Sequence, residues 1–462
     1  MIDLNHVTFS YGKDAEQKNL TDIHLHMKPG ECILLCGKSG CGKTTLTKLL
    51  NGLIPHFEEG SLEGTVRVCN MEVKETPLYK LSTKVGSVFQ NPKSQFFNLD
   101  SDSELAFGLE NSGVPGPEIK KRVQETVRDL AIEKLQHRRI FDFSGGEKQI
   151  LAFASVYAMN PSVYILDEPS ANLDHETTEK LKSLIETIKG QNKTVVVAEH
   201  RLYYLKDLAD RVLYMEDGRI KKEYTGEAFF GMEDEEKHKL GLRTSNEEAR
   251  KNLPGAPESG VLEVKNLSVS IGKHKVFENV SFAANPGEVM GICGRNGAGK
   301  TTLMRTLTGL LKEKSGGIYY NGKKCTPKDR NRLSFLIMQD VNHQLFSDSV
   351  LNECLLSLED EKKRSRIDEM LTAYHLDGFQ ESHPMALSGG QKQRLAVVTG
   401  VLSEKKVLVF DEPTSGLDYT HMQLVGDTLR MLAKEGHIVL VVTHDEELIN
   451  RTCDRVFRLK GV

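Results

Sequence analysis

The chain has 462 residues, enough for two or three domains with full-sized hydrophobic cores. Its 61 Lys and Arg residues and 65 Asp and Glu residues give a formal net charge of −4, which argues against a broad nucleic-acid-binding surface. The longest apolar runs have the length of a strand and fall far short of the roughly 20 residues that cross a bilayer. The eight cysteines include no C-x-x-C pair, which disfavours a zinc or dithiol site.

The first informative segment is a glycine-rich loop between a predicted strand and a predicted helix. The apolar run 32–36 precedes residues 37–44, which read GKSGCGKT and match G-x-x-x-x-G-K-[ST], and leucines at helical spacing follow. In this context backbone N–H groups surround phosphate oxygens, and the N-terminus of the helix faces them. We expect Lys43 to reach the outer phosphates and Thr44 to offer its hydroxyl to Mg²⁺.

The same pattern occurs a second time, and the rest of the chain repeats with it. Residues 294–301 read GRNGAGKT and follow the strand-like run 288–293. Two copies at equivalent places make an incidental glycine-rich turn a poor explanation of either one. The repeat predicts two copies of one domain, at 1–230 and 261–462, joined by a charged linker at 231–260 that has room for one short helix.

Within each copy, short β-branched runs alternate with helical patterns, as at 85–89, 163–166 and 194–197. Such alternation predicts a parallel sheet covered by helices. Ligands of such sheets collect at the carboxyl ends of the strands, where Asp167 and His200 are expected to lie. We therefore expect these two side chains to converge with the phosphate loop.

Each copy also has an apolar strand that ends in two carboxylates, Asp167-Glu168 in the first and Asp411-Glu412 in the second. On its own, such a pair before a proline is more often a solvated turn. Beside a phosphate loop, and in both copies, it is typical of phosphoryl transfer, which needs a metal, a lysine and an orienting carboxylate. We interpret the aspartates as Mg²⁺ ligands and the glutamates as the groups that polarise the attacking water.

Two glycine-containing segments, 144–147 (SGGE) and 388–391 (SGGQ), each begin a predicted helix. The pattern S-x-x-[EQ] predicts a capping box at both. Paired glycines form a poor first helical turn, but they expose backbone N–H groups at the positive end of the helix. The segments therefore favour a second anion site in each copy.

These segments resemble the signature of the ABC-type ATPases, which is LSGGQ at 387–391 and a variant, FSGGE, at 143–147. With the phosphate loops, the glutamines Gln90 and Gln339, the carboxylate pairs and the two strand-end histidines, the family's order of motifs occurs twice. The resemblance covers essentially the whole chain outside the linker. It implies an α/β fold class with two tandem P-loop NTPase domains, each with a mostly parallel sheet, an antiparallel β subdomain and a helical subdomain.

The resemblance also implies that the two domains pair head to tail within the chain, with ATP between the phosphate loop of one and the signature helix of the other. A swapped dimer of two chains is the alternative. The family pattern assigns Gln90 and Gln339 to sensing the γ-phosphate and the partner subunit. It assigns His200 and His444 to contacting the γ-phosphate, although a lone strand-end histidine is more often a packing residue.

Together, the residues and the resemblance predict ATP and Mg²⁺ as cofactors and define a full set of expected site residues. The expected catalytic residues are Glu168, Glu412, His200, His444, Gln90 and Gln339. The expected nucleotide-binding residues are Tyr11, Gly37, Ser39, Gly40, Gly42, Lys43, Thr44, Thr45, Ser144, Gly145 and Gly146 in the first copy, and Gly294, Asn296, Gly297, Gly299, Lys300, Thr301, Thr302, Ser388, Gly389 and Gly390 in the second. The expected Mg²⁺ ligands are Thr44, Gln90, Asp167, Thr301, Gln339 and Asp411.

Under head-to-tail pairing, the departures from the family pattern fall in one of the two sites. The second site has Ile271 where Tyr11 of the first would stack on adenine, and it receives the variant signature with Phe143, Glu147 and Ile150. Losing one aromatic stacking contact costs on the order of 1 kcal/mol. We predict that both sites hydrolyse ATP and that the second binds it more weakly.

A closer likeness is to the ATPases of energy-coupling factor importers, which serve vitamins, cobalt and nickel. It rests on residues 88–97 (VFQNPKSQFF) and 104–111 (ELAFGLEN), and the second copy keeps several of these positions. In that group, the region after the glutamine forms a groove that grips helices of a transmembrane subunit. Ordinary core packing is the alternative for the apolar residues concerned. They are Phe96, Phe97, Leu345 and Phe346.

The likeness implies an import ATPase, peripheral on the cytoplasmic face of the membrane, with a transmembrane coupling subunit and a small substrate-binding membrane subunit as partners and no nucleic acid. Two alternatives are a ribosome-associated tandem ABC ATPase and a sugar-type importer ATPase. Ribosome-associated proteins carry a long basic arm between domains, whereas 231–260 is short and begins acidic. Sugar-type second copies commonly lack the catalytic glutamate, and Glu412 is present. In such importers a separate membrane protein captures the substrate, so this sequence does not indicate which substrate is transported.

Overall fold

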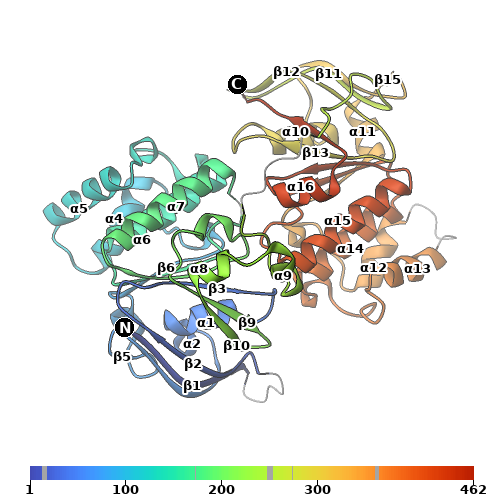
Figure 1. Cartoon of the computed structure of the whole chain (residues 1–462). Helices are drawn as coiled ribbons and strands as arrows, with labels where there is room; N and C mark the ends of the chain where they lie inside the picture. The colour runs from blue at the N-terminus through green and yellow to red at the C-terminus, as the bar shows by residue number, and fades with distance from the viewer. Residues whose placement is uncertain (13–17, 172, 247–252, 273, 359–363, 462) are drawn as a thin grey trace. The chain divides into compact units, whose positions relative to one another are not determined.

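The computed structural model describes residues 1–12, 18–171, 173–246, 253–272, 274–358 and 364–461, and it divides into two compact units (Figure 1). The first unit comprises Met1–Glu247 with Gly416–Thr420, and the second comprises Glu248–Ser415 with His421–Val462. The first unit thus extends beyond the predicted boundary at residue 230. Phe230 and Leu242 are buried in its core, on either side of the short helix α9 (Asp234–Lys239).

The main sheet of the first unit has the order β10-β9-β3-β8-β7-β6, and β10 pairs with β9 in the antiparallel direction while the other pairs are parallel. Every residue of β3, β7 and β8 is buried, as expected for parallel strands covered by helices on both faces. The strand bounds are β3 Cys32–Gly37, β6 Val85–Val88, β7 Val163–Asp167, β8 Thr194–Ala198, β9 Arg211–Glu216 and β10 Arg219–Thr225.

A separate antiparallel sheet, in the order β2-β1-β4-β5, completes the strands of the first unit. Strand β2 alternates buried and exposed residues along much of its length, which is the pattern of a sheet with one face on the core and one in solvent. Helix α1 (Lys43–Leu50) packs its leucines into the same core as this sheet. The strand bounds are β1 Ile2–Tyr11, β2 Leu20–Met27, β4 Gly60–Val68 and β5 Met71–Glu72, and the short helices α2 (Leu53–His56) and α3 (Leu78–Leu81) lie near them in sequence.

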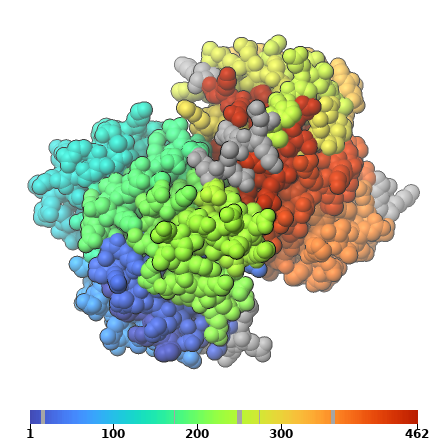
Figure 2. All heavy atoms as spheres, in the orientation of Figure 1, coloured from blue at the N-terminus to red at the C-terminus, as the bar shows by residue number. Residues whose placement is uncertain are grey.

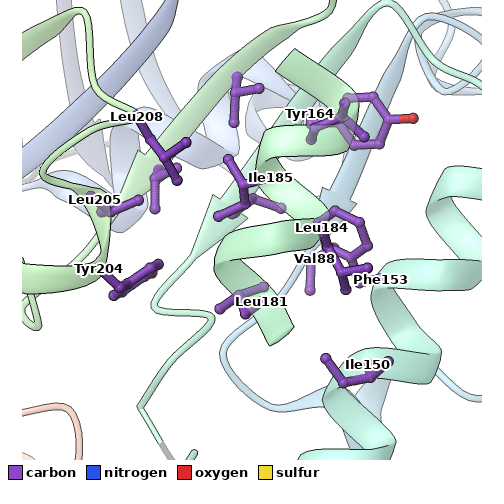
Figure 3. Packing of buried hydrophobic residues seen from close by; sticks show 14 of the residues in the cluster. Val88, Ile150, Phe153, Tyr164, Leu181, Leu184, Ile185, Tyr204, Leu205 and Leu208 are labelled. Atoms are coloured by element: carbon purple, nitrogen blue, oxygen red, sulfur yellow. The ribbon is translucent and has the colours of Figure 1, made fainter. Parts of the chain in front are cut away.

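Helices α4 (Ser101–Asn111), α5 (Gly116–Asp129) and α6 (Gly145–Ala158) gather on one side of the first unit, away from β1 and β2 (Figure 1). Figure 2 shows this cyan helical lobe and the blue lobe around β1 and β2 as separate bulges. Phe153 of α6 packs with Val88 of β6 and Leu184 of α7 (His175–Gly190) in one buried cluster (Figure 3). The helix that carries the first signature is therefore fixed directly to the central sheet. The bounds of α8 are Gly226–Phe230.

The second unit repeats this architecture with a five-stranded parallel sheet, β16-β17-β18-β13-β19, and an antiparallel sheet, β12-β11-β14-β15. The predicted fold class, two tandem α/β domains each with a mostly parallel sheet, an antiparallel sheet and helices, is confirmed. The strands are β11 Leu262–Ile271, β12 His274–Ala284, β13 Val289–Cys293, β14 Ser315–Tyr320, β15 Lys323–Lys324, β16 Ser334–Ile337, β17 Val407–Asp411, β18 Ile438–Val442 and β19 Arg455–Arg458. The helices are α10 Lys300–Leu307, α11 Pro327–Leu333, α12 Val350–Ser357, α13 Ser365–Ala373, α14 Gly389–Leu402, α15 Tyr419–Lys434 and α16 Glu446–Thr452.

Among the described residues, no helix combines the length and apolar character that a membrane crossing requires.

Candidate active site

The phosphate loop of the first unit closes around the amine of its own lysine. The loop leaves β3 and enters α1 at Gly42, whose φ of 103° lies in the left-handed region that favours glycine. Lys43 is buried, and its Nζ donates hydrogen bonds to the carbonyl oxygens of Gly37 at 3.1 Å and Lys38 at 3.2 Å. A phosphate in this loop would meet both the amine and the free N–H groups of the first turn of α1.

Asp167 lies beside two hydroxyl groups at the start of α1. Thr44 Oγ1 and Thr47 Oγ1 lie 3.4 Å and 3.5 Å from its carboxylate oxygens, and Thr47 Oγ1 also donates to Thr44 O at 2.9 Å. Asp167 ends β7 inside the molecule, and burial raises the pKa of its carboxyl group. A buried carboxylate beside hydroxyls is a set of hard oxygen donors, so these residues fit the Mg²⁺ ion that the predicted chemistry requires.

Thr47 was not among the expected site residues. The available signal was its position three residues after Thr44 in a predicted helix, which places the two side chains on one face.

Glu168, Gln90 and His200 converge beside the same loop. Gln90 Nε2 donates to Glu168 Oε2 at 2.6 Å, and His200 Nε2 lies 3.5 Å from Glu168 Oε1. His200 Nε2 also lies 3.2 Å from Lys43 Nζ. The Glu168 N–H donates to Ala198 O at 2.8 Å, which ties the ends of β7 and β8 together. The strand-end residues of the first copy thus surround the phosphate loop.

The carboxyl group of Glu168 is buried next to a second carboxylate, that of Glu199. Burial raises the pKa of Glu168 to about 8, and the charge of Glu199 adds to the shift while Lys43 opposes it. The higher pKa makes the deprotonated form of Glu168 a stronger base, which suits the expected role of proton acceptor for an attacking water. Glu199 was not an expected site residue, although it directly precedes His200 at the end of a strand.

Tyr11 and Ile271 mark the clearest difference between the two copies. Tyr11 ends β1, and its hydroxyl lies 3.4 Å from Thr45 Oγ1 while the Lys48 amine lies 5.8 Å from the ring centroid. The ring therefore stands beside the first turns of α1. At the end of β11, Ile271 is 57% exposed and has no ring to stack on a base.

Both predicted capping boxes are present at the signature helices. In the first unit, Ser144 N–H donates to Glu147 Oε2 at 2.8 Å and Glu147 N–H donates to Ser144 Oγ at 3.2 Å. The Ser388 and Gln391 pair does the same at the start of α14. A Cβ added at Gly145 would meet nothing within 4 Å, so packing does not account for this glycine and open access to the helix end remains as its reason.

The second unit builds a similar centre with different hydrogen bonds around its glutamate. Lys300 Nζ donates to Gly294 O at 2.9 Å, and burial raises the pKa of Asp411 to about 6. Glu412 Oε2 accepts hydrogen bonds from Thr443 Oγ1 at 3.1 Å and from the His444 N–H at 3.3 Å. Nε2 of the same histidine lies 3.6 Å from Glu412 Oε1.

The other expected residues occupy the corresponding elements of their own units. Ser39 and Gly40 lie in the first phosphate loop, and Asn296, Gly297 and Gly299 lie in the second, where Asn296 Oδ1 is 3.1 Å from His444 Nε2. Thr301 and Thr302 lie in α10, Gln339 follows β16, Gly146 lies in α6, and Gly389 and Gly390 begin α14. The pairing of each phosphate loop with the signature helix of the other copy stays a prediction.

Comparisons with known proteins agree on the family. A family model described as "ABC transporter" matches residues 20–171 and 277–415. A protein of Treponema denticola that carries the provisional name ABC transporter ATP-binding protein is 46% identical over 469 residues, covering 100% of this chain and 96% of that protein. A protein of Methanosarcina mazei with the same provisional name is 33% identical over 516 residues, covering 100% of this chain and 87% of that protein.

The solved structure of RNase-L Inhibitor shares the fold, with a TM-score of 0.63 at 21% identity over 99% of this chain and 89% of that one. At this identity, the likeness extends to the fold alone. The family match and the two relatives cover the phosphate loops and the rest of both copies. The chain therefore belongs to the ABC transporter family of ATP-binding proteins and is an ATPase with two nucleotide-binding domains.

Proposed function

We propose that the chain is the ATPase subunit of an energy-coupling factor type importer and drives uptake of a vitamin or a transition-metal ion through separate membrane subunits. It would act at the cytoplasmic face of the membrane as a peripheral protein. The observation that carries this proposal is the loop that follows β6 in the first unit and β16 in the second. In each loop, buried polar side chains fix the backbone, and one aromatic side chain remains exposed to solvent.

In the first unit, the loop begins at Gln90 and is held by one amide and one carboxylate. Gln95 Oε1 accepts from the Phe89 N–H at 2.9 Å, and Gln95 Nε2 donates to Ser87 O at 2.9 Å. The buried carboxylate of Glu104 accepts from the Phe97 N–H at 3.1 Å. These bonds fix the backbone while the ring of Phe97 remains 74% exposed.

The second unit has the same arrangement. Gln344 Oε1 accepts from the Met338 N–H at 3.1 Å, and Gln344 Nε2 donates to the carbonyl oxygen of Leu336 at 2.7 Å. Glu353 accepts from the Phe346 N–H at 2.9 Å, and the Phe346 ring is 81% exposed. Core packing, the alternative for this region, holds for Leu345, which is buried, and for Phe96, which packs against the core.

Other apolar residues, several of them exposed, lie near the Phe97 ring. Phe97 stacks on Phe107 with ring centroids 4.9 Å apart, and the neighbouring Leu99 and Phe141 are also exposed. The Ile140 N–H donates to Leu99 O at 2.9 Å, which brings the segments of Leu99 and Phe141 together. Clustered exposed apolar side chains mark interaction sites, and an amphipathic helix of a membrane subunit is a partner of matching chemistry. In the second unit, the exposed Leu356 and Met385 occupy the positions of Phe107 and Phe141.

The loop also leads directly to the hydrolytic centre. Gln90, its first residue, donates to Glu168, so a partner that moves the loop also moves a group bound to the proposed base. In the proposed mechanism, Lys43 and the loop N–H groups bind the phosphates, Glu168 orients water and accepts its proton, and His200 contacts the γ-phosphate.

Bound Mg²⁺ would neutralise charge on the phosphate oxygens, with Asp167 and Thr44 as its protein ligands and with Gln90 near the γ-phosphate. Asp411, Thr301 and Gln339 would serve the second unit in the same way. Both sites would hydrolyse ATP, and the second would bind it more weakly because Ile271 cannot stack on the base.

The test is co-purification of the full-length chain with membrane subunits from its native host. We expect the native chain to purify with integral membrane proteins, and the F97A/F346A variant to lose them while it still binds ATP. The F97Y/F346Y variant keeps both aromatic surfaces and should retain the membrane partners. Co-purification with ribosomes and without membrane proteins would instead assign the chain to the ribosome-associated class.

A further inference from the structure

Glu199 is a buried carboxylate between the loop that follows β7 and the loop that follows β8. The side chain is 2% exposed. Its Oε1 accepts from the Ser170 N–H at 3.0 Å and from the Tyr204 hydroxyl at 2.9 Å. Its Oε2 accepts from the N–H groups of His200 at 2.8 Å and Arg201 at 3.2 Å. One side chain therefore connects the backbone after the proposed base to the backbone of the proposed γ-phosphate contact.

Burial of a carboxylate is costly unless its charge is satisfied, and hydrogen bonds to a charged acceptor are stronger than those between neutral groups. Glu199 meets this condition with four donors, three of them backbone N–H groups. Those three N–H groups would in turn lose their acceptor if the carboxylate were removed. The hydrogen bonds thus hold the two loops at a fixed separation.

The second unit connects the same two loops from the other side of its histidine. Thr443 occupies the position of Glu199, and its hydroxyl donates to Glu412. We call the hydrogen-bonded connection between the two loops the tie. In the second unit the tie is made by Asp445, whose Oδ2 accepts from Thr414 Oγ1 at 2.6 Å. Oδ1 of Asp445 accepts from the Leu448 N–H at 3.2 Å and caps α16.

Among the positions that differ between the two versions, three belong to the hydrogen bonds described above or pack beside them. The first unit has Glu199, Arg201 and Tyr204, and the second has threonine, aspartate and leucine at the equivalent places. An aspartate at position 201 beside Glu199 would bring two carboxylates together, which is unfavourable in a buried setting. Arg201 instead donates to Leu173 O at 2.8 Å.

Tyr204 is also part of the hydrogen-bonded connection that Glu199 makes in the first unit. Tyr204 is buried in the hydrophobic cluster with Leu205 and Leu208 (Figure 3). Burial and the nearby charge of Glu199 hold the pKa of Tyr204 well above its ordinary value, so the hydroxyl stays a donor. The leucine of the second unit needs no such partner.

We propose that Glu199 is a positioning residue of the first site, which holds His200 and the loop after Glu168 in register as Asp445 does in the second site. This inference rests on the roles proposed above for His200 and Glu168. It predicts that the two ties are interchangeable, provided that all three positions change together.

The first experiment compares E199A with the native full-length chain. Amide hydrogen exchange is expected to accelerate in peptides that contain Ser170 and His200, and to stay unchanged in peptides that contain Thr414 and His444. Steady-state ATP turnover is expected to fall by about half or more, because one of two sites is impaired, with nucleotide Kd within about threefold of the native value.

The second experiment uses the E199T/R201D/Y204L variant, which gives the first unit the three residues of the second-unit version, with the Ser170 hydroxyl in the place of Thr414 as the donor. In the triple variant, amide exchange at Ser170 and His200 should be slow again, and most of the native ATP turnover should be restored. E199T alone should show the fast exchange and low turnover of E199A. The proposal would be overturned if E199A kept native amide exchange and native ATP turnover. It would also be overturned if the triple variant did not fold, or if its exchange and turnover were no closer to native than those of E199T. If E199A does not fold, the comparison between E199T and the triple variant decides. Full turnover in E168Q would refute the proposed roles and would leave the exchange result as a separate test of the tie.

Discussion

The two proposed catalytic centres have the same lysine, aspartate, glutamate and histidine, yet the hydrogen bonds to the proposed base differ between them. In the first unit, Gln90 donates to Glu168 from the loop that carries the exposed Phe97. In the second, Glu412 accepts from Thr443 and from the His444 N–H. The comparison teaches that the sheet and the phosphate loop set the positions of these groups, while the residue before the histidine, Glu199 in the first unit and Thr443 in the second, decides whether that position donates a hydrogen bond to the glutamate.

The largest effect is expected when both proposed bases are removed. E168Q/E412Q should lose ATP turnover by about a hundredfold or more, the scale of general-base catalysis, and should still bind ATP because the phosphate loops are unchanged. Turnover by released phosphate and binding by a fluorescent ATP analogue measure the two properties. The single variants E168Q and E412Q then measure how much each site contributes to total ATP turnover. Native turnover in the double variant would contradict the proposed roles.

A smaller effect should follow from restoring a base-stacking ring in the second unit. I271Y is expected to raise the ATP affinity of that site by about fivefold, equivalent to about 1 kcal/mol of aromatic stacking. The measurement is ATP titration of the variant with Lys43 replaced by alanine, so that binding to the second site dominates. I271L is the control because it adds no ring, and equal affinities of the two variants would show that this position does not contact the base.

The smallest effect concerns the hydroxyl of Thr47, which donates to Asp167 in the first unit, whereas Met304 occupies the equivalent position in the second. T47V should raise the Mg²⁺ concentration for half-maximal turnover by about twofold to threefold, because a hydrogen bond to the proposed metal ligand is lost. Turnover against Mg²⁺ concentration measures this shift. M304L should leave the curve unchanged, and an unchanged curve for T47V would place Thr47 outside the metal site.

Some structural features could not be predicted from local pattern. Leu345 and Phe346 are neighbours in one loop, but Leu345 is buried and Phe346 is exposed, and the backbone of this loop is fixed by Glu353 from a helix further along the chain. The extent of the first unit similarly depends on burial of Leu242, which lies beyond the boundary predicted from composition.

The sequence by itself determined the tandem α/β fold and located most of the residues that gather around the first phosphate loop. The phosphate loops, the signature segments and the strand-end carboxylates are local patterns, and a parallel sheet brings the carboxyl ends of its strands to one edge. Only the tertiary structure decided how Glu199 and Asp445 connect their loops and that Thr47 faces Asp167. Those facts depend on which donors come within hydrogen-bond distance of a buried carboxylate, and their partners lie on separate elements that packing alone brings together.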